Sequence, residues 1–342
     1  MVKKVVFWFV ILFPAVIACA MVLLIATAAF VIRISEDAEA YARTVVPFQK
    51  LARAVYFRQR PHWQAQSHCI VFDEVLFYKP RPGKCEFNTI EFSTVLTFDS
   101  KGFRQTSSTI LRDDDRPNRG RIIVLGDSQA MGWGVQDEET FASVLAAEYG
   151  FEVFNLGVSS YGTARELLRL QKEFDLQQGD IVVIQYHPND LGENFAFLKS
   201  GSLPRRSQSD LGLLAHPPQE YEILQVTRSI AFSISSKLTE IIRGKLSEIL
   251  FSDSDGQNPA EAFLAVIDHF KELAQARVVV CEVASSGRAT SFTEDLRRLT
   301  EGRMRVLEPV WETSDFYRLD DHLNAIGHSK LAYLIAGAIS SD

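Results

Sequence analysis

Ser128 stands at a place in this 342-residue chain where a hydroxyl could do chemistry. It follows the apolar run Ile122–Leu125, which is typical of a buried strand, and Gly126 ends that run. Open parallel sheets place their reacting groups just past the carboxyl ends of the strands. A serine becomes a nucleophile there when a histidine, held by a carboxylate, takes its proton. Taken alone, however, Gly-Asp-Ser also fits an ordinary turn.

Three later segments carry the other groups that such chemistry needs. The second apolar run ends at Gly157, and a third run, Ile181–Tyr186, leads into His187–Asp190 with an asparagine at position 189. Near the C-terminus stands Asp320-Asp321-His322. Serine, glycine, asparagine and histidine therefore appear in this order, and the first three each follow a predicted strand.

This order of motifs resembles that of the SGNH (GDSL-like) hydrolases and spans residues 120–340. The blocks of that family begin with Gly-Asp-Ser, a lone Gly, Gly-x-Asn-Asp, and a terminal Asp-x-x-His or Asp-x-His. The resemblance implies an ester hydrolase with a three-layer, doubly wound parallel α/β fold and no cofactor. Two residues depart from the family pattern. His187 replaces a glycine of the third block, and Asp321 replaces the glycine of the Asp-Gly-His form.

The resemblance also assigns roles to single residues. Ser128 would be the nucleophile, His322 the base, and Asp320 the acid that orients the imidazole. The oxyanion hole would consist of the backbone N–H groups of Ser128 and Gly157 and the side-chain amide of Asn189. Asp321 leaves the identity of the orienting acid open. Asp320 is preferred, because a carboxylate directly before His322 turns back onto its ring with difficulty.

Other polar residues near these motifs have simpler interpretations. We expect Asp127 to be a structural hydrogen-bonding residue, Asp190 to brace its loop, and His328 to be structural within the last helix. His187 is expected to be a loop histidine, with a pocket-lining role as the alternative. No Cys or His pair has the spacing of metal ligands, so no metal site is predicted.

The N-terminal residues 5–32 predict a membrane anchor that contacts the lipid bilayer. They are 28 consecutive residues without a charge. A helix of that length measures about 42 Å, more than the roughly 30 Å hydrocarbon core of a bilayer. It is also longer than the roughly 7–15-residue apolar region of a signal peptide. Cleavage near Ala26-Thr27-Ala28 remains the alternative. Lys3 and Lys4 favour a cytoplasmic N-terminus and a single pass through the inner (cytoplasmic) membrane, with the rest periplasmic or extracellular.

Charge and cysteine content agree with export. Residues 1–33 hold three of the 36 basic and none of the 43 acidic residues, so the remainder has a net charge of −10. Such a surface does not attract nucleic acid or anionic headgroups. In an oxidising compartment Cys69 and Cys85 would form a disulfide, with two unpaired thiols as the alternative. Cys281 is expected to be a buried strand residue.

The sequence predicts three regions: an anchor over 1–33, a juxtamembrane helix and accessory β region over 34–118, and a catalytic domain over 119–342. Strands and helices alternate in the last region, which favours a parallel sheet covered on both faces. An insertion is expected over about 195–257. Its amphipathic stretch, Ile223–Leu250, would be a packed helix or, alternatively, a lid or a partner-docking face. The expected strands are 122–125, 152–156, 181–186, 278–283 and 305–307, and the expected helices lie near 139–149, 164–174, 260–274 and 325–339.

The prediction for function is a membrane-anchored, extracytoplasmic serine esterase that hydrolyses O-acyl esters, most simply O-acetyl, on carbohydrate or cell-envelope polymers. One alternative is an O-acyltransferase that passes the acyl group to a glycan beside a membrane acyltransferase partner. A second alternative is a non-catalytic envelope scaffold, against which the retained Ser128, Asn189 and His322 argue.

Overall fold

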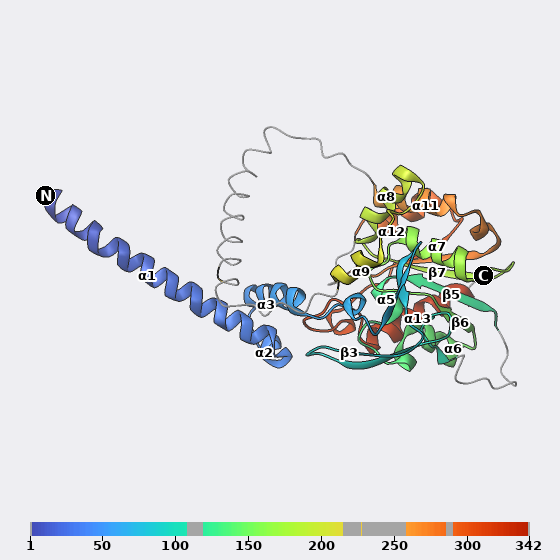
Figure 1. The fold of residues 1–342 in the computed structure, drawn as a ribbon, viewed down its shortest axis with the longest axis horizontal. Coiled ribbons are helices and arrows are strands. Elements are labelled where there is room, and N and C mark those ends of the chain that lie inside the picture. Colours follow the sequence, from blue (N-terminus) through green and yellow to red (C-terminus); the bar gives the residue numbers. More distant parts are fainter. Residues whose placement is uncertain (1, 108–118, 215–226, 228–257, 285–289, 341–342) are drawn as a thin grey trace. The chain divides into compact units, whose positions relative to one another are not determined.

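The computed structural model describes residues 2–107, 119–214, 227, 258–284 and 290–340, which form two compact units (Figure 1). The first unit includes residues 2–60 and 318–320, and the second includes the described residues of 61–317 and 321–340. Within the predicted catalytic domain, 119–342, residues 318–320 group with the N-terminal helices.

The first unit is helical, as predicted for residues 35–60. It contains α1 (Val2–Ser35), α2 (Ala38–Ala42) and α3 (Val46–Gln59). Apolar side chains of α1 and α3 pack together, and the rings of Phe30 and Phe48 meet edge to face with centroids 5.3 Å apart. Among the described residues, Pro14–Ser35 is the stretch long and apolar enough to cross a membrane, with a mean hydropathy of 2.8. A signal sequence near an N-terminus would have the same character.

The second unit is built on a five-stranded parallel sheet in the order β6-β5-β7-β8-β9. Continuous apolar runs are typical of strands that are buried on both faces. In β5, Ile123 and Leu125 face one core while Ile122 and Val124 face the other, as the two-residue period of a strand requires. The strands are β5 (Arg121–Gly126), β6 (Glu152–Asn155), β7 (Ile181–Tyr186), β8 (Arg277–Glu282) and β9 (Arg305–Leu307).

Helices cover both faces of this sheet, which confirms the predicted three-layer α/β fold (Figure 1). On one face pack α6 (Phe141–Tyr149) and α13 (Ala325–Ser340). On the other face pack α7 (Thr163–Glu173), α8 (Asp190–Ser200), α11 (Pro259–His269) and α12 (Phe292–Thr300). Shorter helical elements are α5 (Ser128–Met131), α9 (Gln208–Leu214), and the 3₁₀ turns Trp63–Ala65, Asp137–Glu139, Lys271–Gln275 and Thr313–Asp315.

The accessory β region also forms as predicted. It consists of two antiparallel pairs, β1 (Ile70–Asp73) with β2 (Phe77–Pro80), and β3 (Gly83–Asn88) with β4 (Ser93–Phe98). A disulfide joins Cys69 to Cys85, with their Cα atoms 5.2 Å apart, so the predicted pairing is confirmed. Cys281 is buried in β8, also as predicted.

The predicted insertion starts later than residue 195. Helix α8 continues to Ser200, because Phe197 is buried in the core on that face of the sheet. The predicted helix 260–274 is likewise shorter, since α11 ends at His269 and a 3₁₀ turn follows. The amphipathic stretch Ile223–Leu250, with its alternative roles as lid or docking face, lies outside the described residues except for Thr227.

Candidate active site

The side chains of Ser128 and His322 meet although 194 residues separate them. The Oγ atom of Ser128 lies 2.7 Å from Nε2 of His322, a hydrogen-bond distance. Both side chains are largely buried, with exposed fractions of 8% and 6%. The predicted convergence of the serine and the histidine is therefore confirmed, and it has the geometry of a nucleophile beside its base.

A sharp turn between β5 and α5 presents Ser128. Gly126 has φ +147°, and a Cβ there would lie 2.6 Å from both the Gln185 side chain and Ala130, so no other residue fits. Oε1 of Gln185 accepts the N–H groups of Asp127 and Ala130, which fastens the turn to β7. Oδ1 of Asp127 accepts the N–H of Gln129 at the start of α5, so Asp127 is the structural hydrogen-bonding residue predicted.

The loop that carries His322 is fixed from two sides. The imidazole stacks on Trp133, with ring centroids 4.6 Å apart and planes inclined by 13°. Nε2 of Gln129 donates to the carbonyl of Asp321 at 3.0 Å, and Oε1 of Gln129 accepts the N–H of Leu323 at 3.0 Å. The sequence interpretation missed Gln129 and Trp133. The adjacency of Gln129 to Ser128 was the one available signal, because its partners lie more than 190 residues away.

The two acidic residues before His322 have different surroundings. Oδ1 of Asp321 lies 3.6 Å from Nδ1 of His322, too far for a hydrogen bond, and its side chain is 24% exposed. The carboxylate of Asp320 belongs to the first unit, where it accepts from the Tyr56 hydroxyl and pairs with Arg60. The Asp320 side chain is thus buried and held by two partners. Its role as the group that orients the imidazole stays a prediction.

The three predicted oxyanion donors differ in their hydrogen-bond partners. The N–H of Ser128, at the first position of α5, has no acceptor among the described residues. Nδ2 of Asn189 donates to Oδ2 of Asp127 at 3.3 Å, which brings this amide beside the nucleophile turn and leaves its second N–H for another acceptor.

The third predicted donor is Gly157. Its N–H donates to Oδ1 of Asn155 at 3.0 Å, and its role as an oxyanion donor stays a prediction. Glycine is nevertheless required here. A Cβ would lie 2.5 Å from the backbone nitrogen of Met131, so the close approach that needs glycine is to α5.

The loop after β7 is organised around its histidine and aspartate. Nδ1 of His187 accepts the N–H of Asn189 and lies 3.9 Å from Oδ2 of Asp127. Oδ2 of Asp190 accepts from the Thr163 hydroxyl, so Asp190 braces the loop as predicted. His187 therefore helps to shape the segment that presents Asn189.

Buried titratable groups surround this site. Burial, and then the charges of Asp190 and Asp127, raise the pKa of Glu166 well above its usual value. Burial, followed by the charge of Asp127, also raises the pKa of Asp190. These carboxyl groups therefore favour their neutral form more than exposed ones do. On the opposite face of the sheet, burial lowers the pKa of His328 to about 3, and its Nδ1 accepts the N–H of Phe141, which confirms a structural role.

The chain matches no protein-family model and no curated protein. Among solved structures it is similar to a lipolytic protein of the G-D-S-L family from Veillonella parvula, at 11% identity over 64% of this chain and 98% of the other, with a TM-score of 0.37. A variant of an acetyl xylan esterase from Geobacillus stearothermophilus has 13% identity, coverages of 66% and 96%, and a TM-score of 0.35. A carbohydrate esterase family 2 enzyme from Corynascus thermopiles has 14% identity, coverages of 68% and 68%, and a TM-score of 0.35.

Proposed function

We propose that this protein is a serine esterase of the SGNH type that hydrolyses O-acyl esters, with Ser128 as nucleophile and His322 as base. The observation that carries the proposal is the 2.7 Å contact between Ser128 Oγ and His322 Nε2. Ester hydrolysis by a serine requires such a contact, because the imidazole must take the hydroxyl proton.

The reaction follows from this geometry. Nε2 of His322 takes the hydroxyl proton while Ser128 Oγ bonds to the ester carbonyl carbon. The Ser128 N–H and the free N–H of Asn189 stabilise the oxyanion, an effect commonly worth about 3 kcal/mol per donor. The C–O bond to the alcohol then breaks, and His322 returns its proton to the departing oxygen. Water, deprotonated by His322, attacks the acyl-serine, and the carboxylic acid leaves as Ser128 regains its hydrogen.

The setting of this chemistry is proposed to be extracytoplasmic, with α1 as an uncleaved anchor. The apolar stretch Pro14–Ser35 supports the anchor, and the basic pair Lys3-Lys4 supports a cytoplasmic N-terminus. The Cys69–Cys85 disulfide supports an oxidising compartment for the second unit. The proposed substrate is an O-acetylated glycan of the cell envelope.

The test uses the full chain in detergent. A fluorophosphonate probe should label the parent protein, and Ser128→Ala should abolish both labelling and acetyl release from p-nitrophenyl acetate. Ser200→Ala, which changes an exposed serine in α8, is the matched control and should label normally. Equal labelling of Ser128→Ala and parent would overturn the proposal. If acetyl is released only when a glycan acceptor is added, the protein is an acyltransferase and not a hydrolase.

A further inference from the structure

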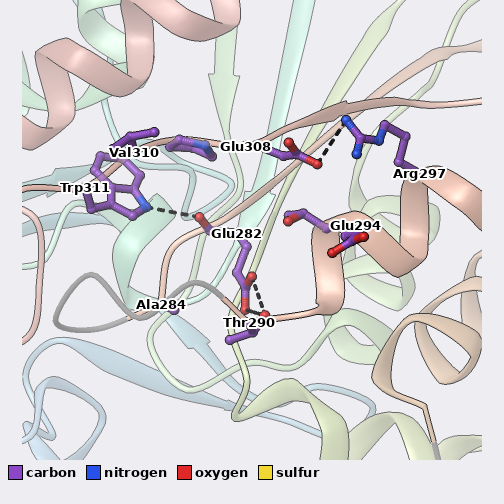
Figure 2. Close-up of a pocket in the computed structure, with 10 residues that line it drawn as sticks. Glu282, Ala284, Thr290, Glu294, Arg297, Glu308, Val310 and Trp311 are labelled. Carbon is purple, nitrogen blue, oxygen red and sulfur yellow. Dashed lines mark hydrogen bonds and ion pairs between the residues drawn. The ribbon is translucent and has the colours of Figure 1, made fainter.

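A pocket lies at the carboxyl ends of β8 and β9, outside the set of residues assigned above (Figure 2). Its volume is about 330 Å³, within the range of roughly 300–1,000 Å³ that is common for ligand pockets. The residues that shape it are Glu282, Glu294, Arg297, Glu308, Val310 and Trp311.

One wall combines an aromatic ring with a fixed carboxylate. The Thr290 hydroxyl lies 2.7 and 2.6 Å from the two carboxylate oxygens of Glu282, which restrains that side chain. Nε1 of Trp311 donates to the backbone carbonyl of Glu282 at 3.3 Å, so the indole is held beside the acid. Val310 is 80% exposed and extends the apolar surface next to Trp311.

The other wall is charged and comes from α12 and the segment after β9. Arg297 lies 3.3 Å from Glu308, and both side chains are substantially exposed, so this ion pair is weak and open to exchange with a ligand. Glu294 stands on α12 one helical turn before Arg297 (Figure 2). Three carboxylates and one guanidinium therefore line this pocket.

The residues that line the pocket restrict the kind of ligand that it can bind. Carboxylates only accept hydrogen bonds, so a ligand must supply O–H or N–H donors. The excess of acidic groups disfavours an anion. The apolar surface of Trp311 and Val310 requires an apolar face on the same ligand. A neutral sugar ring satisfies all three conditions, because hydroxyl donors surround its edge and C–H groups cover its face.

The pocket shares one edge of the sheet with Ser128. Strand β8 pairs with β7, and β7 pairs with β5, so two strand spacings, on the order of 10 Å, separate β8 from β5. His187 lies between them. Its Nδ1 atom lies 3.9 Å from Oδ2 of Asp127, next to Ser128. It also acts on Glu282 in the pocket: burial raises the pKa of Glu282, and the charge of His187 opposes that rise.

We propose that this pocket binds a neutral saccharide ring of the substrate. Its distance from Ser128 indicates that the bound ring is a neighbour of the ring that bears the ester. The proposal rests on the esterase function proposed above and adds to it a binding site for a second ring of the glycan. It requires oligosaccharides to be better substrates than small esters, because only they occupy both places at once.

The binding test uses the full chain carrying Ser128→Ala, with titration calorimetry of neutral oligomers of glucose, xylose and N-acetylglucosamine. At least one should bind, and Trp311→Ala should weaken it tenfold or more, with a smaller loss for Trp311→Phe. The matched control is Arg303→Ala, which breaks an equally exposed ion pair with Asp268 away from the pocket and should leave binding unchanged. Oligogalacturonate should not bind. Failure of all neutral oligomers, or binding of cationic chitosan oligomers alone, would overturn the proposal.

A kinetic test separates this proposal from the esterase proposal. With Ser128 intact, Trp311→Ala should lower kcat/KM for acetylated xylo-oligosaccharides about tenfold more than it lowers kcat/KM for p-nitrophenyl acetate. Equal losses on both substrates would make Trp311 a structural residue and overturn the subsite. If neither substrate is hydrolysed by the parent protein, the esterase proposal fails, while the calorimetry still decides whether the pocket binds sugar.

Discussion

Gln129 holds His322 through the peptide groups on both sides of the imidazole. Its amide nitrogen donates to the carbonyl before the histidine, and its amide oxygen accepts the N–H after it, each at 3.0 Å. Gln129 is itself 2% exposed and directly follows Ser128. One side chain therefore couples the position of the base to the helix that carries the nucleophile.

Replacing Gln129 by Leu should keep the bulk and remove both hydrogen bonds. Because a misplacement of about 1 Å can cost about 100-fold in rate, we expect kcat to fall by roughly 10–100-fold with KM little changed. Steady-state kinetics on p-nitrophenyl acetate would measure this, with Gln208→Leu at the start of α9 as control. A rise in KM at constant kcat would contradict a positioning role.

Asp320→Asn should reduce kcat by orders of magnitude more than Asp321→Asn. Asp320 is the acid anchored by Tyr56 and Arg60, whereas Asp321 is partly exposed and lies 3.6 Å from Nδ1 of His322. A neutral amide in place of the orienting carboxylate favours the wrong imidazole tautomer. Kinetics of the two variants, with thermal melts to detect unfolding, give the ranking. The reverse order would make Asp321 the orienting acid.

Removal of the Cys69–Cys85 disulfide should destabilise the second unit. A closed loop of this length contributes about 3 kcal/mol in the chain-entropy model. The double variant Cys69→Ala/Cys85→Ala should therefore melt at a lower temperature than the parent. Dithiothreitol should lower the Tm of the parent and leave that of the double variant unchanged. Identical melting of parent and variant would show that the bridge adds no stability.

His328 should weaken the fold in acid. Its pKa is about 3 in the folded protein and near 6.5 when exposed, so below pH 6.5 the unfolded chain binds a proton that the folded chain does not. The free energy of unfolding should fall by up to about 1.4 kcal/mol per pH unit from this residue as pH drops toward 3. Urea unfolding of the parent and of His328→Asn, whose side-chain oxygen can accept the Phe141 N–H, should give a shallower decline in the variant. Parallel curves would refute this origin.

The parts of the fold that the sequence predicted are those set by continuous apolar runs. Strand Ile181–Tyr186 has the predicted bounds and is buried along its whole length, as its apolar run indicates. Strand Arg305–Leu307 also has the predicted bounds, although it is a partly exposed edge strand. The meeting of Ser128 and His322 was predictable from the four motifs and from the carboxyl-edge rule for parallel sheets.

Other features could not be predicted, because they depend on single hydrogen bonds or single side chains. The N–H of Gly157 is taken by Asn155, a local contact that no periodicity encodes. Gln129 finds partners 192 and 194 residues away, and the extent of α8 depends on the burial of Phe197. Motif order therefore identified the nucleophile and the base, but not the side chains that hold them.

The ring of Trp133 that supports His322 is supported in turn by Phe87 of β3, with centroids 4.6 Å apart. The hairpin of β3 and β4 thus supports the imidazole through Trp133. A fragment that begins at Arg119 would retain every strand of the main sheet together with Ser128 and His322. It would nevertheless lose the aromatic surface behind Trp133. Such a fragment would keep the reacting residues and lose the aromatic packing that fixes the position of the imidazole.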